Sequence, residues 1–463
     1  MPFGKKLTLD AFMIAIFLSA LDLGIVAPSL TVIAADLQFP VRAVVWVIAL
    51  HLAVFVLALP LMEAWGARAG IRNWFAFSLV LFAGGSFAAG ASDSWVTLIA
   101  GRVVQALGAG GIVPLLSVQI RRLTYLRKRS WRVFVHVVLA VLFIWVPMLS
   151  SGITWHFGWR WLFWINLPVA AVIYVLSFRF ARGGGYRIPD YHTVGLFYFA
   201  GILLSAMVAV SQLDPRKGWG MITDPEFLPF AVLTVGLLIP MMMVERQAEH
   251  PFFQSELMTD LRLIGLNAAV ALAGCTWVAV VLVPGWMADL FGQPRGTGGI
   301  YLSIVAGAAW LTLPFARWIS ARWGYQGGLA LGFFFTAAAY FILALMEEPI
   351  ALLAVLAILG GGLGFTLAAP VHELLFEVVP VRRVKNSLVA LAMFRAAGAA
   401  FGLVVIGLSF FNPADSPAVN GLPMQWKQGF QTGMLTAAGA AVLGFVISLL
   451  LPLPKEVDEN SEG

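Results

Sequence analysis

An aspartate and an arginine stand inside long apolar runs of this sequence, at positions that allow a buried ion pair. Asp22 lies in the stretch FLSALDLGIVAPSLTVIAADL, within a run that has no other charge from residue 11 to 34. On insertion scales, an unpaired Asp in mid-membrane costs about 2.5–3.5 kcal/mol. Arg102 lies about 10 Å of helical rise after Trp95, and Asp22 lies about 14–18 Å from the end of its own run. The depths overlap, so we predict that Asp22 and Arg102 pair.

Such a pair can do proton chemistry. A neighbouring Arg favours the ionised carboxylate, whereas burial favours the protonated one. If a conformational change alters this balance, proton uptake can be coupled to the movement of a second molecule. Ser19, Val26 and Ser29 share the helical face of Asp22 and predict the semi-polar wall of a water-filled cavity. The alternative is a structural ion pair that only holds two helices together.

A second group of polar residues lies near the C-terminus. His372 and Glu373 precede Pro380 in one apolar run, and Arg395 follows Asn386 in the next. By helical rise Glu373 is about 10 Å, and Arg395 about 14 Å, from the shared loop. We predict that Glu373 and Arg395 can pair, with Glu373 as a second proton-coupling candidate. The alternative is a set of charges that helps to close one end of the molecule.

The remaining chemistry-bearing residues are isolated. For His51 and for His136, we expect a hydrogen bond to a backbone carbonyl, and for His51 a substrate contact is the alternative. Cys275 is the one cysteine, which excludes an intrachain disulfide and a cysteine metal cluster. We find no nucleotide-binding loop, metal-binding cluster or nucleophile motif, so we expect no cofactor, no metal and no enzyme activity.

The elements that position these residues are membrane helices. The 463 residues are 60% hydrophobic and 11% charged, whereas soluble domains carry about 25% charged residues. The sequence therefore predicts an all-α polytopic membrane protein. Fourteen apolar runs of spanning length lie roughly at 9–34, 43–63, 73–91, 95–118, 133–153, 161–179, 193–212, 227–244, 263–285, 299–316, 326–345, 349–372, 387–410 and 429–452.

Loop charges predict the orientation. With a cytoplasmic N-terminus, 21 of the 29 Lys and Arg residues lie on the cytoplasmic side, as the positive-inside rule requires. Fourteen spans place both termini on that side. The basic stretch RRLTYLRKRSWR at 121–132 is then a loop near anionic lipid, so nucleic acid is not an expected partner.

The sequence also contains an internal repeat. PLMEAWGARAG (60–70) resembles PFARWISARWG (314–324), and LGAGGIVP (107–114) resembles LGFTLAAP (363–370), at offsets of 254 and 256 residues. Two anchors at nearly one offset indicate duplicated halves. We predict a six-helix bundle at 1–185, two inserted helices at 186–250, a second six-helix bundle at 251–453 and a cytoplasmic tail at 454–463.

Several motifs together resemble one known family. LDLGIVAPSLTVIAADL resembles the first-helix signature of the fourteen-helix drug:proton antiporter branch of the major facilitator superfamily, and RVVQALGAGGIVP resembles its fourth-helix motif, with Gln105. GWRWLFWINLPV, HPFFQSELM and FRAAGAAFG resemble three further segments. The resemblance implies two pseudo-symmetric six-helix bundles plus two inserted helices, and a substrate cavity lined by residues including His51, Gln105, His372 and Arg395.

The loop after the second helix departs from the family pattern. Ala67 stands in place of the usual Asp, and Glu63 in place of the first Gly. We expect Glu63 to be solvated or paired with Arg68, and Gly to be kept where a tight turn leaves no room for a Cβ. The gating residues that the resemblance and the repeat imply are Glu63, Arg68, Gly70, Arg72, Pro147, Arg322 and Gly324.

The resemblance implies a secondary exporter of small amphipathic compounds in the bacterial cytoplasmic membrane, working by alternating access and driven by proton influx. In a Gram-negative cell it allows a periplasmic adaptor as a partner. The fifth-helix signature Gly-Pro-x-x-Gly-Gly is reduced here to Pro147 in VPMLSS. The alternative is therefore a transporter of lipid or lipid-linked metabolites with weak or no proton coupling.

Overall fold

The computed structural model describes residues 24–39, 41–124, 129–178, 193–213, 215–249, 251–253, 260–292, 294, 296–346, 348, 351–367, 369–378, 384–410 and 423–451. Every element assigned in these ranges is helical, which confirms the all-α prediction. Nine of the described helices are long and apolar enough to cross a membrane. The total of fourteen spans stays a prediction.

The first half of the chain folds into one set of contacting helices. Its elements are η1 (Ala27–Ser29), α2 (Leu30–Asp36), α3 (Val41–Val44), α4 (Trp46–Ala69), α5 (Ile71–Gly90), α6 (Trp95–Thr124), α7 (Arg129–Phe157), α8 (Trp161–Trp164) and α9 (Asn166–Ser177). Helix α6 packs on α4 and α5, and α5 also packs on α8 and α9. Small residues allow the close crossing of α5 and α6, because a Cβ at Gly85 would lie 2.2 Å from the backbone nitrogen of Gln105.

The second half forms a corresponding set. It comprises α13 (Leu261–Ala279), η3 (Val280–Leu282), α14 (Val283–Phe291), α15 (Gly299–Leu345), α16 (Leu352–Leu367), α17 (Ala369–Val378), α18 (Val384–Gly407), η5 (Leu408–Phe410) and α19 (Pro423–Leu450). Asp260 caps α13, because its Oδ1 accepts from the backbone nitrogen of Arg262 at 2.8 Å. Helix α13 packs on α18 and α19, and α15 packs on α16 and α19.

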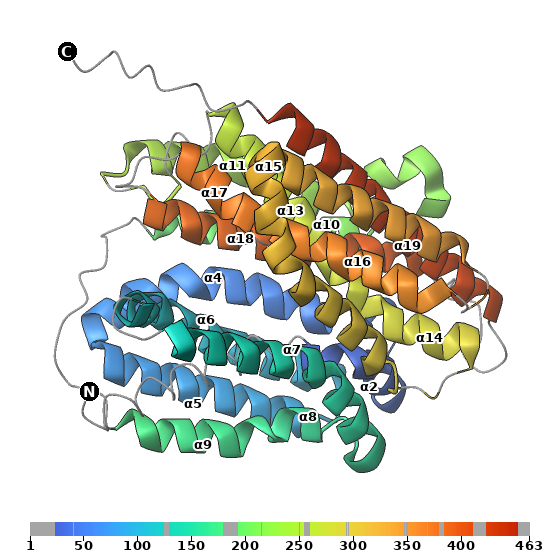
Figure 1. Cartoon of the computed structure of the whole chain (residues 1–463), viewed down its shortest axis with the longest axis horizontal. Helices are drawn as coiled ribbons and strands as arrows, with labels where there is room; N and C mark the ends of the chain where they lie inside the picture. Colours follow the sequence, from blue (N-terminus) through green and yellow to red (C-terminus); the bar gives the residue numbers. More distant parts are fainter. Residues whose placement is uncertain are drawn as a thin grey trace.

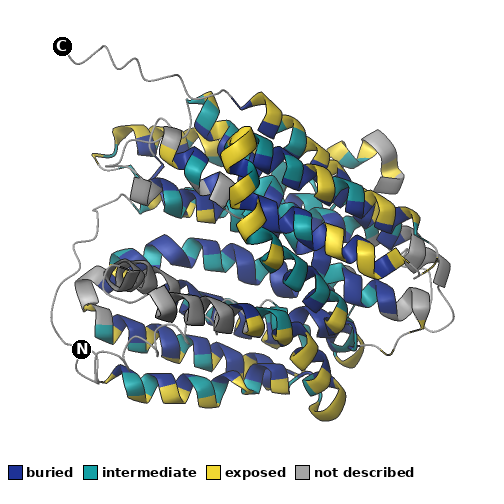
Figure 2. Cartoon of the chain, in the orientation of Figure 1, coloured by how far each residue is buried: buried dark blue, intermediate teal, exposed yellow. Residues whose placement is uncertain are grey.

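A helix pair lies between these two sets in the sequence. Helices α10 (Val194–Ser211) and α11 (Leu228–Gln247) pack on each other, with η2 (Pro215–Thr223) between them. Helix α10 also contacts α4 and α18, one helix from each half. Most residues of α11 are exposed, as those of an apolar helix that faces lipid would be. Figure 2 shows α4, by contrast, mostly in the dark blue of buried residues.

The two halves contact each other between α4 and α18, and they meet again at one end of the molecule. Figure 1 shows them side by side, with α2 and α14 close together at that end. Here η1 contacts η3, α14 and α15, and α7 packs on α15. We call this end, where Asp36 and Phe291 terminate their helices, the α2/α14 end.

The internal repeat has a structural counterpart in two turns. Gly70 separates α4 from α5, and Gly324 interrupts α15, with φ of 84° and 79° and ψ of 138° and 159°. A Cβ at either glycine would meet no atom within 4 Å. The expected crowding is therefore wrong, and the requirement for glycine is the positive φ. Both turns follow a helix with an internal proline, Pro60 or Pro314.

Candidate functional site

The best-connected polar site among the described residues surrounds Arg102, which is 0% exposed inside the first half. Its Nε donates to the carbonyl oxygen of Val47 on α4 at 3.3 Å, and its Nη1 donates to Oε1 of Gln105 at 2.7 Å. Its guanidinium carbon lies 5.7 Å from the ring centre of Phe163 on α8, within cation–π range. Burial removes water from this charge, so these contacts are needed to stabilise it.

Gln105 extends the network to two more helices. Its Nε2 donates to Oγ of Ser86 on α5 at 2.8 Å, and Nδ2 of Asn166 on α9 donates to the same oxygen at 3.3 Å. All three of these side chains are buried. Arg102 and Gln105 are three residues apart and so share one face of α6. The network therefore joins α4, α5, α6 and α9 through polar groups in an apolar bundle.

His51 also belongs to this site. Its Nδ1 lies 3.2 Å from the carbonyl oxygen of Arg102. A carbonyl oxygen only accepts, so Nδ1 carries the hydrogen. This confirms the expected hydrogen bond to a backbone carbonyl. Because His51 is 2% exposed, the structure does not support the alternative of a cavity-facing substrate contact.

The predicted partner of Arg102 cannot be placed. Asp22 and Ser19 lie outside the described residues, as do the side chains of Arg68 and His372. The Asp22–Arg102 pair therefore remains a prediction. The structure shows the surroundings of Arg102 alone, which contacts residues of α4, α6 and α8.

The predicted cavity wall on the first helix is wrong for two residues. Val26 and Ser29 are both 0% exposed, and Oγ of Ser29 lies 2.6 Å from Oγ1 of Thr154 on α7. Both residues pack against protein because Ser29 lies in η1 and Val26 directly precedes it, and η1 contacts α7 as well as η3, α14 and α15 of the second half.

Pro147 does lie at a junction between the halves. A Cβ at Gly299 of α15 would lie 1.9 Å from the carbonyl oxygen of Pro147, so α7 and α15 are in backbone contact there. The serines that replace the family's glycines add polar contacts. Oγ of Ser150 donates to the carbonyl oxygen of Ile25, and Oγ of Ser151 accepts from the backbone nitrogen of Gly299 at 2.9 Å. Glycines at these positions would make neither bond.

Arg395 lies in a very different setting on α18. The backbone around it is pressed onto α13, because a Cβ at Gly274 would lie 1.9 Å from the Arg395 carbonyl oxygen. Its Nε and Nη2 are buried, and neither finds an acceptor in the described part of the chain. Glu373 is partly exposed, and no ion pair joins it to Arg395. The predicted Glu373–Arg395 pair is therefore wrong for this structure: matched depth does not make two side chains point toward each other.

The other gating candidates, Glu63, Arg72 and Arg322, lie in different surroundings. Glu63 is 6% exposed, so it is not solvated. The alternative, pairing with Arg68, stays a prediction because the Arg68 side chain lies outside the described residues. The guanidinium of Arg72 lies 5.2 Å from the ring centre of Phe178, which links the start of α5 to the end of α9. Arg322 is exposed beside the turn at Gly324.

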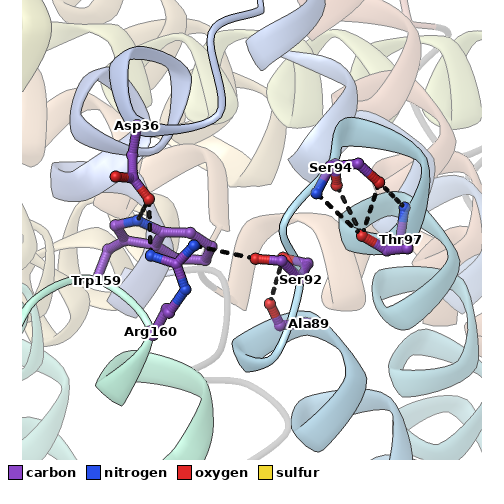
Figure 3. A network of polar contacts seen from close by, with 7 residues as sticks. All are labelled: Asp36, Ala89, Ser92, Ser94, Thr97, Trp159 and Arg160. Carbon is purple, nitrogen blue, oxygen red and sulfur yellow. Dashed lines mark hydrogen bonds and ion pairs between the residues drawn. The ribbon is translucent and has the colours of Figure 1, made fainter.

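Sequence reasoning missed two polar sites, one around Asp36 and one around Glu245. Asp36 at the end of α2 accepts from Nε1 of Trp159 at 2.9 Å and from Nη1 of Arg160 at 2.7 Å, and Nη2 of Arg160 donates to the carbonyl oxygen of Ser92 at 3.1 Å (Figure 3). These donors, first Trp159 and then Arg160, lower the pKa of Asp36. Glu245 of α11 is 3% exposed, and its Oε2 accepts from the backbone nitrogen of Phe253 at 2.9 Å.

Comparison with known proteins decides the family. The model of the Major Facilitator Superfamily matches residues 12–403. The chain belongs to the major facilitator superfamily. The bacterial homologue of the human lysosomal transporter Spinster, in its inward-facing and unoccupied conformation, superimposes with a TM-score of 0.66 at 14% identity and covers 97% of each chain. This likeness shows the fold, and membership of the superfamily indicates a transporter rather than an enzyme.

Two superfamily relatives carry efflux names. The multidrug transporter protein MdtP of Bacillus subtilis (strain 168) is 22% identical over 414 residues, which are 87% of this chain and 75% of MdtP. The MFS-type efflux pump MMF1 of Pseudozyma antarctica (strain T-34) is 31% identical over 243 residues, 51% of this chain and 44% of MMF1. This chain therefore matches less than half the length of MMF1. The relatives come from a bacterium and a fungus.

Proposed function

We propose that this superfamily member is a secondary active exporter of small amphipathic organic compounds, coupled to proton influx. The observation that carries the proposal is the buried polar network around Arg102 in a bundle that otherwise packs apolar surfaces. A charge held this firmly at mid-membrane supports a role in transport, because such residues are costly to bury and mark ion or substrate pathways. The efflux names of the relatives support the direction of transport.

In this proposal Asp22 is the proton-coupling residue and Arg102 is its cation. Both termini are cytoplasmic, the membrane is a bacterial cytoplasmic membrane, and the α2/α14 end faces outward. The contacts between α7 and α15 then close the outward side. Alternating access requires these contacts to break, and the hydrogen bond between Ser151 and Gly299 is one that must be lost.

The test is transport in proteoliposomes with an imposed pH gradient, with a cationic dye, an anionic dye and a fluorescent lipid as parallel substrates. We expect gradient-driven dye transport by the wild type and its loss in Asp22→Asn, which keeps the shape but removes the titratable charge. Asp93→Asn, an exposed Asp in the loop before α6, is the matched control and should transport as the wild type does.

Proton release distinguishes the coupling mechanism. Substrate added to solubilised wild-type protein should release protons, and Asp22→Asn should release none. If the variant releases protons as the wild type does, Asp22 is not the coupling residue.

A second candidate function rests on the departure in α7. Ser150 and Ser151 tie α7 to the first helix and to α15, so the family's glycine-rich site is replaced by hydrogen bonds. A lipid or lipid-linked metabolite transporter with weak proton coupling fits this change. Gradient-independent movement of the fluorescent lipid without dye transport would favour it.

A further inference from the structure

Arg395 carries an inference that rests on the function proposed above and names a substrate class for it. The two nitrogens that lack an acceptor, Nε and Nη2, form one edge of the guanidinium. Their N–H bonds run parallel along that edge, which is the geometry that binds both oxygens of a carboxylate, sulfonate or phosphate. The unused part of Arg395 is therefore a complete anion-binding edge.

Among the described residues, no carboxylate is paired with Arg395. Glu373 on α17 makes no ion pair with it, and the buried Glu245 on α11 accepts from the backbone of Phe253. On α13, Oγ1 of Thr276 donates to the carbonyl oxygen of Ala273 within its own helix. An arginine stays charged in proteins, so this buried edge remains cationic and is stabilised by whatever anion reaches it.

One stripe of α18 becomes buried directly after this arginine. Leu388, Ala392, Arg395 and Ala399 follow one stripe at helical spacing. Ala392 is exposed, and Leu388 and Arg395 are partly exposed, whereas Ala399 is 4% exposed. Arg395 thus lies where an apolar, accessible stretch of helix gives way to packed protein. An amphiphile whose apolar body follows the stripe would bring its head group to the guanidinium.

We propose that Arg395 is the anion-binding residue of this transporter, and that its ligands are amphipathic compounds with a carboxylate, sulfonate or phosphate head group. The apolar stripe of α18 receives the body of the ligand, and the Nε/Nη2 edge receives the head group. The side chain turns this edge outward when the ligand arrives, since the rest of Arg395 is already partly accessible. The same chemistry is shared by soluble amphiphilic anions and by anionic lipid.

The test measures binding of three pyrene probes with the same hydrophobic body: 1-pyrenebutyrate, 1-pyrenebutanol and 4-(1-pyrenyl)butyltrimethylammonium. Full-length protein in phosphatidylcholine nanodiscs is titrated, and energy transfer from tryptophan to pyrene reports binding. We expect the wild type to bind pyrenebutyrate about tenfold tighter than the alcohol, as charged hydrogen bonds allow. Equal binding of anion, alcohol and cation by the wild type would overturn the proposal without any variant.

Substitutions then assign the preference to Arg395. In Arg395→Gln the preference for pyrenebutyrate should disappear, and in Arg395→Lys part of it should remain, because a point charge lacks the two-pronged edge. Arg317→Gln removes an exposed arginine of α15 and should bind as the wild type does. An unchanged preference in Arg395→Gln overturns the proposal.

A further titration with anionic lipid distinguishes the two sources of the anion, a soluble amphiphile and a membrane lipid. If 30% phosphatidylglycerol in the nanodiscs weakens pyrenebutyrate binding to the wild type, anionic lipid occupies the site; if it does not, the ligand is a soluble amphiphile. Either outcome supports an anion site. Proton-driven dye transport with no Arg395-dependent anion binding refutes this inference but leaves the proposed function intact. Arg395-dependent anion binding without any transport refutes the proposed function but leaves this inference intact.

Discussion

Arg102 and Arg395 are both deep in the helices of this protein, yet their surroundings differ in kind. Arg102 is 0% exposed and donates to Val47 and Gln105, and its network reaches Ser86 and Asn166. Arg395 buries Nε and Nη2 without an acceptor among the described residues. The first arginine is bonded to the fold through several helices, whereas the second keeps two donors without a partner in the described part of the chain. Burial alone therefore does not tell what a charged residue contributes.

The sharpest test of this contrast is Arg102→Met. The change removes the donors for Val47 and Gln105 and leaves buried acceptors unsatisfied, so we expect a loss of about 3 kcal/mol or more in unfolding free energy. Thermal unfolding of the solubilised protein measures it as a large drop in Tm or as failure to recover folded protein. A drop no larger than that of Arg395→Met would remove the contrast between the two sites.

Ser86→Ala breaks the same network at a neutral member. It removes the acceptor of both Gln105 and Asn166, so we expect a loss of about 1–2 kcal/mol. Ser177→Ala is the matched control on α9, because that buried hydroxyl donates only to Tyr174 of its own helix in the described structure. Equal shifts in Tm for the two variants would show that the network is not cooperative.

Asp36→Asn measures how much a partly exposed charge in the same half contributes to the unfolding free energy. The Asp36–Arg160 pair is about 45% and 35% exposed, so we expect a loss below about 1 kcal/mol. Because the pKa of Asp36 is lowered in the fold, its contribution is present above the ordinary Asp pKa of about 3.9 and is lost as the pH falls below it. The Tm difference between wild type and Asp36→Asn should therefore shrink between about pH 5 and pH 3, and a difference that grows on acidification would contradict this.

The smallest expected effect is that of Arg395→Met. It removes a buried charge that has no partner in the described structure and keeps much of the stem, so the unfolding free energy should change by less than about 0.5 kcal/mol or should rise. A marked fall in Tm would mean that Arg395 is a structural residue, which would make it resemble Arg102 after all.

The sequence by itself determined the membrane class, the helical fold and the duplicated turns. Apolar runs of spanning length have no other stable form in lipid, and the glycines at 70 and 324 mark the same backbone conformation in both halves. The hydrogen bond of His51 was also predictable in kind, because a buried ring nitrogen requires a partner and backbone carbonyls are abundant.

Only the tertiary structure decided which polar groups meet. Helical rise gives the depth of a residue, but its azimuth matters as much, and the azimuth follows from how the helices pack. Glu373 and Arg395 lie at similar depths and do not pair, whereas Ser29 and Thr154, 125 residues apart, are in contact. The partner of Gln105 follows from the close crossing of α5 and α6 at Gly85. Rotating any of these helices about its own axis by a fraction of a turn would have changed the partners without changing the depth of a single residue.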